Sequence, residues 1–559
     1  MNTKTQEMAP MTHSVDPILV EVIGNAFFSL VEEMGEALVK ASYSSNIKER
    51  RDCSTALFDG DGRTLAQAEH IPIHLGSLLG IIEAVLKRYP KTEIRPGDMF
   101  IGNDPYSGGG THLPDVVLVS PVFVEGSLLG FVSNLAHHAD FMDRGSAHIF
   151  QEGLRIPPIR IFQEGHLQKD ILDLILCNCQ VPDERQGDFR AQFAANHLGV
   201  KRFEELCGRY GSETIQAAGG ALLDYAERKT RAGIAQIPDG VFTFSDHFDE
   251  PALPEILRLQ VRIEIRGDEM HLDFSGNPPQ GRHGMNMTWT ALLATVYYAV
   301  KTVVDPTIPP NAGLYRPVRV TSPKGSILTC QPPAAMNFRT QTCQRVVDLI
   351  HGALAKAIPE KVTAAHNGAN TAIFLSGHNP RTNRYYTYLE TIGGGFGARA
   401  TKDGLDGVQV HITNTSNLPV EAFEQEYPLQ VRRYELVQDS GGPGKWRGGM
   451  GILREISVTE GESIFEFSGS RIKVAPWGLF GGLEGGKASV SIERKQTDTP
   501  NETENVLRTG DSVIVVSPGA GGYGDPRERD RERVRRDLRE ERISSSAASV
   551  DYGADEKQS

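Results

Sequence analysis

The sequence predicts an α+β fold of several lobes, in which an N-terminal helix and two β-hairpins precede a central helical layer and a β-rich, glycine-rich C-terminal region. Three patterns favour this fold class. Apolar residues recur at helical spacing between residues 16 and 42, apolar and polar residues alternate at strand spacing beyond residue 237, and glycines cluster in the last third of the chain. With 559 residues, 39% of them hydrophobic and 23% charged, the chain can bury a large core.

The first elements are expected to be one long helix and a β-hairpin. Helical spacing extends from Asp16 to Ser42, and Pro17 occupies an early position that a helix tolerates. Two strand-like runs, 55–58 and 63–68, then flank Asp59–Gly62, whose glycines permit the positive φ angles of a tight loop. These runs predict the first hairpin.

A second hairpin and a helical layer follow. After a helix over Leu79–Tyr89, the runs Val116–Val124 and Ser127–Leu135 are rich in Val, Leu and Phe, and Glu125-Gly126 between them is a turn signal. We therefore expect two paired strands at this point. The helical layer comprises Asp170–Cys177, Asp188–Leu206 and Ser212–Lys229.

The second half of the chain combines strands, a helix and glycine-rich segments. The runs Val241–Phe244, Leu257–Arg266 and Met270–Phe274 alternate apolar and polar residues, as half-buried antiparallel strands do, and Thr288–Val304 returns to helical spacing. Glycine clusters between short strand-like runs then predict many tight turns and bulges. The clusters occupy residues 393–397, 441–444, 448–451, 481–482 and 519–524.

These patterns divide the chain into five consecutive regions. The last one holds a charged helix over about Arg529–Glu541 and then a Ser/Ala-rich end that we expect to be mobile. The five regions are a flexible N-terminus (1–15), an α+β region with the candidate metal site (16–235), a central α+β region (236–390), a glycine-rich β region (391–526) and the charged helix with its tail (527–559).

Charge and hydropathy exclude several classes of partner. A formal charge of −13 argues against a broad nucleic-acid surface, because phosphate binding needs a basic stripe and here the basic residues are interleaved with acids. The longest apolar runs, around 78–86 and 291–300, are too short to span a bilayer, and residues 1–15 lack the apolar core of a signal peptide. Six cysteines without a Cys-x-x-Cys pair fit free thiols in a reducing compartment. We expect a cytoplasmic protein with no nucleic-acid or membrane partner.

Histidine and aspartate concentrate on two segments at the ends of the second hairpin, Gly102–Asp115 and Ala136–Asp140. A three-residue loop between the strands would place Asp115 opposite His137. A two-residue loop would place it opposite Ala136 and turn His137 to the other face unless a bulge intervened. Directly facing residues have Cβ atoms about 5 Å apart, close enough for a carboxylate and an imidazole to share one ion.

Two further residues could complete a metal site. His112 precedes Asp115 by three residues on a glycine-rich loop that can fold it over the same point, and Asp52 begins a strand of the first hairpin, where a carboxylate is costly to bury. Together with His137, these residues form a set of two Asp and two His that suits Zn²⁺, Mn²⁺ or Fe²⁺ better than Mg²⁺ or copper. Such an ion would lower the pKa of bound water and polarise a carbonyl group.

The sequence contains no familiar nucleotide-binding motif beside this site. Gly393–Ala398 follows a strand-like run, but no helical pattern or suitably spaced acidic residue follows it, so we interpret it as a turn. Gly441–Lys445 lacks the glycine spacing and the hydroxyl residue of a phosphate-binding loop. No Gly-x-Ser-x-Gly elbow supports a serine hydrolase.

Five segments carry a family resemblance: ERRDCSTALF (49–58), GNDPYSGGGTHLPD (102–115), NLAHHAD (134–140), GGPGKWRGGMG (441–451) and GAGGYGDP (519–526). In these segments, and from residue 16 to residue 526, the chain resembles the hydantoinase B/oxoprolinase family. The resemblance implies a hetero-oligomer and a reaction divided between two polypeptides. A partner similar to hydantoinase A would bind ATP and Mg²⁺ and phosphorylate the carbonyl oxygen of a small cyclic amide, such as a hydantoin, 5-oxoproline or a lactam. This chain would then hydrolyse the activated intermediate.

The resemblance also implies roles for individual residues. The family's metal ligands correspond to Asp52, His112, Asp115 and His137 by their positions in the motifs, and they imply one divalent ion on this chain. His138 and Asp104 would then orient the ligands or transfer protons. An amide carbonyl is a poor electrophile, and phosphorylation of its oxygen creates a leaving group, which accounts for the use of ATP.

Two other functions stay open at this point. The chain could belong to an ATP-dependent ketone carboxylase of the acetone or acetophenone type, which resembles the same family and whose metal subunit joins an enol phosphate to carbon dioxide or bicarbonate. The chain is compact for that branch, which favours hydrolysis. It could also be a non-catalytic scaffold, although carboxylates gathered without a metal would repel one another. His351 lies outside the predicted site, so its replacement by Ala is expected to leave the chemistry intact.

Overall fold

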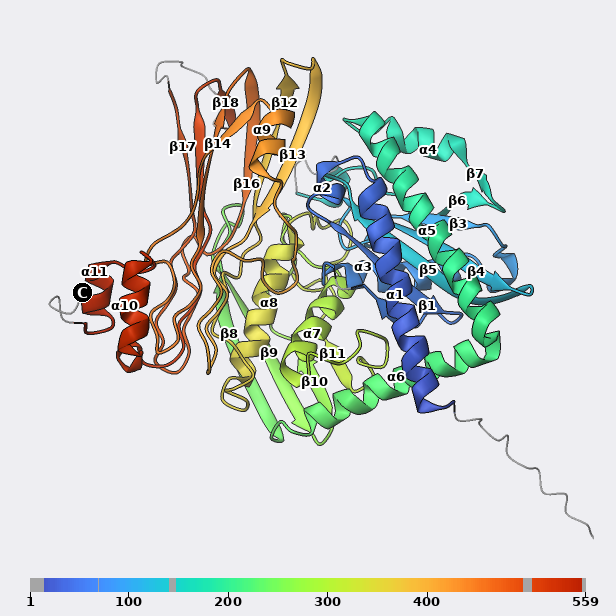
Figure 1. Ribbon diagram of the computed structural model, residues 1–559, viewed down its shortest axis with the longest axis horizontal. Helices are drawn as coiled ribbons and strands as arrows, with labels where there is room; N and C mark the ends of the chain where they lie inside the picture. The colour runs from blue at the N-terminus through green and yellow to red at the C-terminus, as the bar shows by residue number, and fades with distance from the viewer. Residues whose placement is uncertain (1–14, 69, 140–146, 496–504, 555–559) are drawn as a thin grey trace, which may run out of the picture.

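The computed structural model describes residues 15–68, 70–139, 147–495 and 505–554. These residues form four β-sheets. Figure 1 shows three parts that follow one another along the chain: a blue-to-cyan N-terminal part, a green and yellow central part, and an orange and red C-terminal part. This mixture of helices and several sheets confirms the predicted α+β fold class.

A seven-stranded sheet organises the N-terminal part. Its strand order is β2-β1-β5-β4-β3-β6-β7, and every pair of neighbours is antiparallel. Both predicted hairpins belong to it, as the pairs β1–β2 and β4–β5. The strands are β1 (Cys53–Asp59), β2 (Thr64–Gln67), β3 (Met99–Gly102), β4 (Asp115–Val124), β5 (Ser127–His137), β6 (Ile159–Gln163) and β7 (His166–Leu167).

Helices cover both faces of this sheet. The long helices α1 (Pro17–Ala41) and α5 (Pro182–Tyr210) pack on one face, and α3 (His74–Arg88) packs on the other. Because successive side chains of a strand point to opposite faces, Leu57 joins the cluster under α1 and Phe58 joins the cluster under α3. The remaining helices of this part are α2 (Ser45–Lys48), α4 (Lys169–Leu176) and α6 (Ser212–Ile234).

The central part packs two helices against a four-stranded sheet of order β11-β10-β9-β8. Strands β8, β9 and β10 are antiparallel as predicted, and β11 pairs in parallel with β10 after the chain has passed through α7. Helix α8 was not predicted, because its buried face carries many polar residues that interrupt the apolar periodicity. The elements are β8 (Gly240–Phe248), β9 (Leu257–Arg266), β10 (Glu269–Asp273), α7 (Trp289–Val304), β11 (Val318–Thr321) and α8 (Arg339–Leu354).

Two four-stranded antiparallel sheets, β13-β12-β16-β18 and β14-β15-β19-β17, enclose the core of the C-terminal part. The predicted boundary at residue 390 falls inside β13, and β12 pairs with β16, so the β12–β13 hairpin belongs to this part. The elements are β12 (Thr371–Asn379), β13 (Arg384–Ile392), α9 (Val420–Glu426), β14 (Leu429–Leu436), β15 (Ile452–Val458), β16 (Glu462–Ser468), β17 (Ser489–Glu493), β18 (Val506–Arg508) and β19 (Ser512–Val516).

The glycine clusters allow irregular backbone segments to pack against one another, in addition to forming turns. A Cβ atom on Gly449 would lie 1.9 Å from the carbonyl oxygen of Leu405, and one on Gly519 would lie 1.7 Å from that of Ser440. The packed segments are hydrogen-bonded, for example from the N–H of Gly449 to the carbonyl of Phe396 at 2.9 Å. At these positions glycine is required by close approach of the backbone.

The C-terminal end forms two short helices, where we expected one helix and a mobile tail. Helix α10 (Arg531–Arg539) lies within the predicted charged segment, and α11 (Ser545–Val550) follows it. The prediction of a mobile tail missed α11 because Ser/Ala-rich composition does not reveal the apolar residues that pack the two helices together. These are Val534, Ile543, Ala548 and Tyr552.

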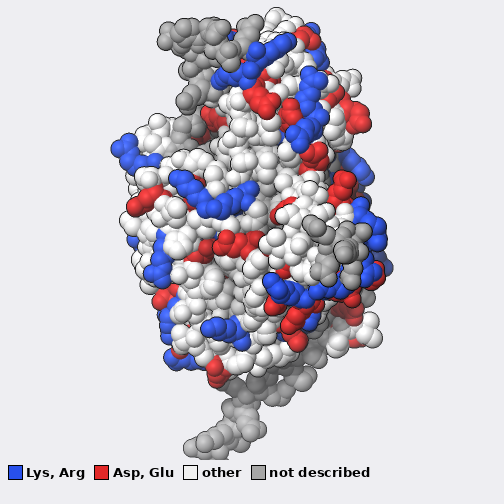
Figure 2. Space-filling model, turned by 90° about the vertical axis from the view of Figure 1, so that its left-hand side faces the viewer, with Lys and Arg blue, Asp and Glu red and all other residues white. Residues whose placement is uncertain are grey.

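Figure 2 views the molecule from the side of the C-terminal part and shows acidic and basic side chains interspersed on this face. The predicted flexible N-terminus lies outside the described residues, apart from Val15, as does the end of the tail from residue 555. Within the described ranges, no helix combines the length and the apolar character needed to cross a membrane.

Candidate metal centre

The β4–β5 hairpin places Asp115 directly opposite His137. Its turn contains only Glu125-Gly126, with φ angles of 50° and 81°, so the strands begin in the register that would bring Ala136 opposite Asp115. A bulge at Leu129 then shifts the pairing by one residue. The short turn and the bulge together therefore produce the Asp115–His137 pair.

His112, Asp115 and His137 converge on one point. Nε2 of His112 lies 3.1 Å from Oδ1 of Asp115, and the rings of His112 and His137 have centroids 5.0 Å apart. Each residue offers one ligand atom, and these atoms lie within 4.8 Å of one another. The side chains are buried, so a ligand bound between them would be largely shielded from bulk water.

Asp52 and His74 approach the same point from two other elements. Asp52 lies just before β1, with Oδ2 3.9 Å from Nδ1 of His137. His74 begins α3, and its Nε2 lies 3.5 Å from Oδ1 of Asp52 and 3.8 Å from Oδ1 of Asp115. The four predicted ligands thus lie together. His74 was missed, because a histidine in the first turn of an apolar helix carries no ligand signal by itself.

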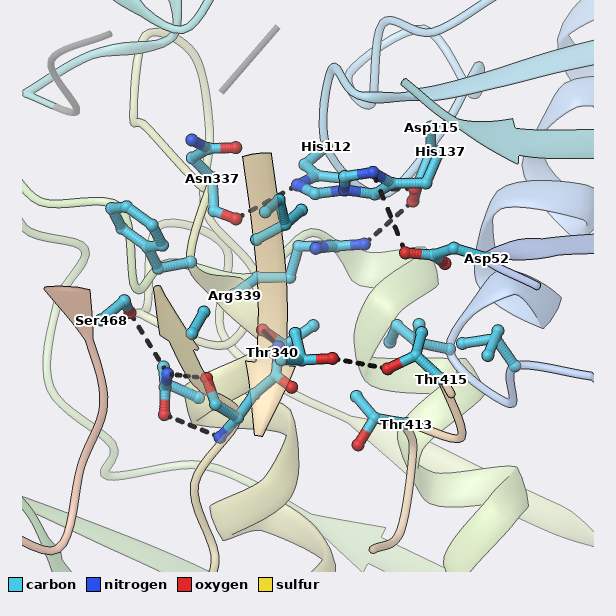
Figure 3. Close-up of a pocket in the computed structure, with 18 of the residues that line it drawn as sticks. Asp52, His112, Asp115, His137, Asn337, Arg339, Thr340, Thr413, Thr415 and Ser468 are labelled. Atoms are coloured by element: carbon cyan, nitrogen blue, oxygen red, sulfur yellow. Dashed lines mark hydrogen bonds and ion pairs between the residues drawn. The ribbon is translucent and has the colours of Figure 1, made fainter. Parts of the chain in front are cut away.

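Arg339 reaches the cluster from α8 and pairs with Asp115 (Figure 3). Its Nη2 donates to Oδ2 of Asp115 at 2.9 Å, and its Nε donates to Oγ1 of Thr111 at 2.8 Å. Thr111 in turn donates to the same Oδ2 at 3.0 Å. These bonds hold Oδ2 and leave Oδ1 turned toward His112.

Burial sets the protonation states of the cluster. It lowers the pKa of His74 and of His112, and with the neighbouring His112 it lowers the pKa of His137 well below the ordinary 6.5. Burial alone would raise the pKa of Asp115, but His112 and the guanidinium beside it hold this pKa well below 3.8. The pKa of Asp52 is raised by burial. Neutral imidazoles and an ionised carboxylate are the forms that bind a divalent ion.

The cluster lines a cavity of about 60 Å³ that also receives polar groups from the central and C-terminal parts. Gln341 connects two of them, since its Nε2 donates to the carbonyl of Asn370 at 2.7 Å and to Oγ of Ser468 at 3.2 Å (Figure 3). Asn337 also lines the cavity, and both polar atoms of its side chain are buried without a hydrogen-bond partner among the described residues. The apolar lining consists of Ile71, Ile73, Phe338, Ala372, Phe374 and Leu389.

The other two predicted site residues, Asp104 and His138, do not line this cavity. Asp104 accepts a hydrogen bond from Nη2 of Arg155 at 2.8 Å, and Nε2 of His138 lies 3.0 Å from Oε1 of Gln192. Successive residues of a strand point to opposite faces, and β5 ends at His137, so its neighbour turns away. Direct proton transfer from either residue to a ligand in the cavity is not available in this arrangement; their role in orienting ligands stays a prediction.

Two aspartates and three histidines buried around one cavity define a candidate metal centre of the kind found in metal-dependent enzymes. The family agrees with the resemblance seen in the sequence motifs. Residues 16–526 match the Hydantoinase B/oxoprolinase family, and the chain belongs to that family.

Known proteins match the chain over nearly its whole length. It is 34% identical to one component of a putative D-/L-hydantoinase of Pseudomonas sp. strain NS671, over 96% of this chain and 95% of that protein. The crystal structure of ATP-dependent caprolactamase from Pseudomonas jessenii is 30% identical and has a TM-score of 0.88, over 98% of this chain and 98% of that chain. A nucleotide-free structure of acetone carboxylase has a TM-score of 0.86 over 96% of this chain and 79% of that chain, at 20% identity, and this likeness concerns the fold alone.

Proposed function

We propose that this chain is the metal-dependent hydrolase subunit of an ATP-dependent cyclic-amide hydrolase. The observation that carries the proposal is the convergence of Asp52, His112, Asp115 and His137 on one cavity, which His74 also lines. Their mixed nitrogen and oxygen donors favour one divalent ion, Zn²⁺, Mn²⁺ or Fe²⁺, as the cofactor of this chain. When bound, such an ion supplies Lewis acidity toward water and toward a carbonyl group.

The remaining groups of the cavity would bind and orient the substrate. A cyclic amide presents one N–H donor and one carbonyl acceptor, and the side-chain amide of Asn337 offers the complementary pair of groups. A buried amide without a partner is costly, so a substrate that satisfies it gains affinity. Phe338 and Phe374 add apolar surface for the ring carbons and exclude water.

The use of ATP is assigned to a separate polypeptide. We propose that a hydantoinase A-like partner binds ATP and Mg²⁺ and transfers a phosphoryl group to the carbonyl oxygen of the substrate. Addition of water to the activated carbon, loss of phosphate and cleavage of the C–N bond would then complete ring opening on this chain. Two findings support the assignment: the sequence has no familiar nucleotide motif, and its relatives include one component of a multi-subunit hydantoinase and an ATP-dependent caprolactamase.

The proposal is tested by a turnover assay of the chain co-expressed with its partner. The substrates are hydantoins, 5-oxoproline, lactams, acetone and acetophenone, the ketones being supplied with bicarbonate, and ATP hydrolysis is followed in each case. Ring opening of a cyclic amide coupled to ATP hydrolysis is the expected result. Bicarbonate-dependent consumption of a ketone without ring opening would instead establish the carboxylase, and active enzyme that contains no divalent ion would exclude the metal centre from the mechanism.

A further inference from the structure

A second buried cluster of histidine and aspartate lies in the central part of the fold. It consists of Asp348 on α8 and of His366 and His411, which lie outside helices and strands. Each residue offers one ligand atom, and these atoms lie within 4.8 Å of one another. The three residues are buried, and none of them lines the cavity of the candidate metal centre.

The carboxylate of Asp348 is arranged like that of Asp115. Its Oδ1 lies 3.0 Å from Nε2 of His411 and 3.4 Å from Nδ1 of His366. Its Oδ2 accepts a hydrogen bond from Nη2 of Arg471 at 3.0 Å. In both clusters, therefore, a buried arginine fixes one carboxylate oxygen and leaves the other facing imidazole nitrogens.

The ion pairs around Asp348 leave its charge only partly compensated. Asp348 belongs to a buried network with Arg471, Asp246, Arg345 and Asp249. Three carboxylates thus share two guanidinium groups within this network. A buried charge without compensation is costly, and a divalent cation beside Asp348 would supply the missing positive charge.

His366 provides an independent sign of a ligand. Its Nε2 is buried and has no hydrogen-bond partner among the described residues. The ring lies between two other rings, with centroids 3.9 Å from His411 and 4.2 Å from Phe396. Burial lowers the pKa of His366 to about 3, so the ring is neutral near pH 7, which is the form that binds metals.

A second cavity, of about 390 Å³, gives access to this cluster. His411 lines it, and so do Thr302 and Phe396, which contact the neighbouring histidines His351 and His366. The two cavities are adjacent, because Ile71 and Thr413 line both of them. An ion could therefore reach the second cluster without passing through the first. The polar lining of this cavity includes His70, Lys301, Gln409 and Asn414.

We propose that Asp348, His366 and His411 bind a second divalent transition-metal ion. Two imidazoles and one carboxylate suit Zn²⁺, Fe²⁺ or Mn²⁺. His351 would position the site, since its Nδ1 lies 3.1 Å from Oγ1 of Thr363, which lies 3.4 Å from Nδ1 of His366. The second site does not depend on the proposed hydrolytic function.

The test counts ions in the full chain with the first centre disabled. The variant His112→Ala/His137→Ala loses two ligands there and keeps the second cluster intact. After removal of metal by a chelator, titration with Co²⁺ is followed by visible absorption and by elemental analysis. The expected stoichiometry is two ions per chain for the unaltered protein and one for this variant. Further replacement of His366 and His411 by Ala should weaken binding of the remaining ion at least 100-fold.

The matched control replaces two exposed histidines, His166 and His378, by Ala and should leave both ions bound. Because the variants could fold incorrectly, anomalous diffraction from Co²⁺-loaded crystals of the unaltered chain provides an independent measurement. It should show a peak between Asp348, His366 and His411. Absence of that peak, or unchanged Co²⁺ binding after replacement of His366 and His411 in the disabled variant, would overturn the proposal.

Discussion

Arg339 donates a hydrogen bond to Asp115 at 2.9 Å, although 224 residues separate them in the sequence. Helix α8 thereby completes a cluster whose other residues come from the N-terminal part. The same helix also carries Asp348 of the second cluster, and a rise of about 1.5 Å per residue places the two positions roughly 13 Å apart along its axis. One helix with buried polar residues therefore orders both clusters.

The first prediction concerns this arginine. Arg339→Lys keeps the positive charge but cannot hold Asp115 and Thr111 together with two separate N–H groups. Metal affinity should fall about 10- to 100-fold, as is usual when a residue that orients a ligand is lost. Competition with a chelator measures this change. The matched control is Arg319→Lys, at an exposed position on β11, and equal affinities of the two variants would contradict the proposed role.

Asn337 separates substrate binding from metal binding. The variant Asn337→Leu removes the amide pair that we expect to face the cyclic amide, while the metal ligands stay in place. KM should rise about 10-fold or more, because a hydrogen-bonded pair contributes roughly 1–2 kcal/mol. Metal content should not change. A variant with unaltered KM on every substrate that the enzyme opens would exclude Asn337 from recognition.

The sequence could predict the residues of the site that are close together along the chain. The hairpin pattern allowed two registers for Asp115 and His137, and a bulge at Leu129, which has no signature in the sequence, decided between them. His74 and Arg339 could not be predicted, because they meet the cluster only through the packing of α3 and α8. Helix α8 escaped prediction for the same physical reason: its polar residues are buried by pairing with distant partners.

The metal-free chain should lose stability as the pH falls below 6.5. Burial lowers the pKa of five histidines that are buried in the fold, so the folded chain binds fewer protons than the unfolded chain below their unfolded pKa of 6.5. Each then costs up to about 1.4 kcal/mol per pH unit. Glu152 and Glu250, whose pKa burial raises to about 7, offset part of this loss. The five histidines are His74, His112, His137, His351 and His366.

Urea denaturation of the metal-free chain between pH 7.5 and pH 5 measures this dependence. The free energy of unfolding should decrease steadily toward acid pH. A free energy that stays constant over this range would show that the buried histidines titrate normally in the folded chain.

The glycine-rich segments give a prediction about packing. Gly449→Ala would bring a Cβ atom to 1.9 Å from the carbonyl oxygen of Leu405, and backbone cannot move away as a flexible side chain can. The free energy of unfolding should fall by about 3 kcal/mol or more. The control, Gly220→Ala, lies in α6 where nothing is within 4 Å, and it should stabilise the chain by about 0.5–1 kcal/mol. Thermal unfolding of both variants compares the two effects directly.

The last prediction separates the two proposed half-reactions. His112→Ala or His137→Ala removes a candidate ligand from the first centre, so ring opening should fall by orders of magnitude. Phosphorylation takes place on the partner in our proposal, and ATP consumption should therefore continue without product, at a rate set by release of the intermediate. Size-exclusion chromatography should show the complex still assembled. Phosphate release and ring opening are measured in the same reaction.

The control for this experiment has to be a histidine without a role in either cluster. His351, which the sequence suggested, does not qualify, because it contacts Thr363 beside His366 in the second cluster. His166 on β7 is exposed, so His166→Ala should retain normal ring opening. Near-normal ring opening by the His112 and His137 variants, with metal content unchanged, would place the chemistry elsewhere. Loss of ATP consumption together with ring opening, in an assembled complex, would contradict the division of the reaction between two polypeptides.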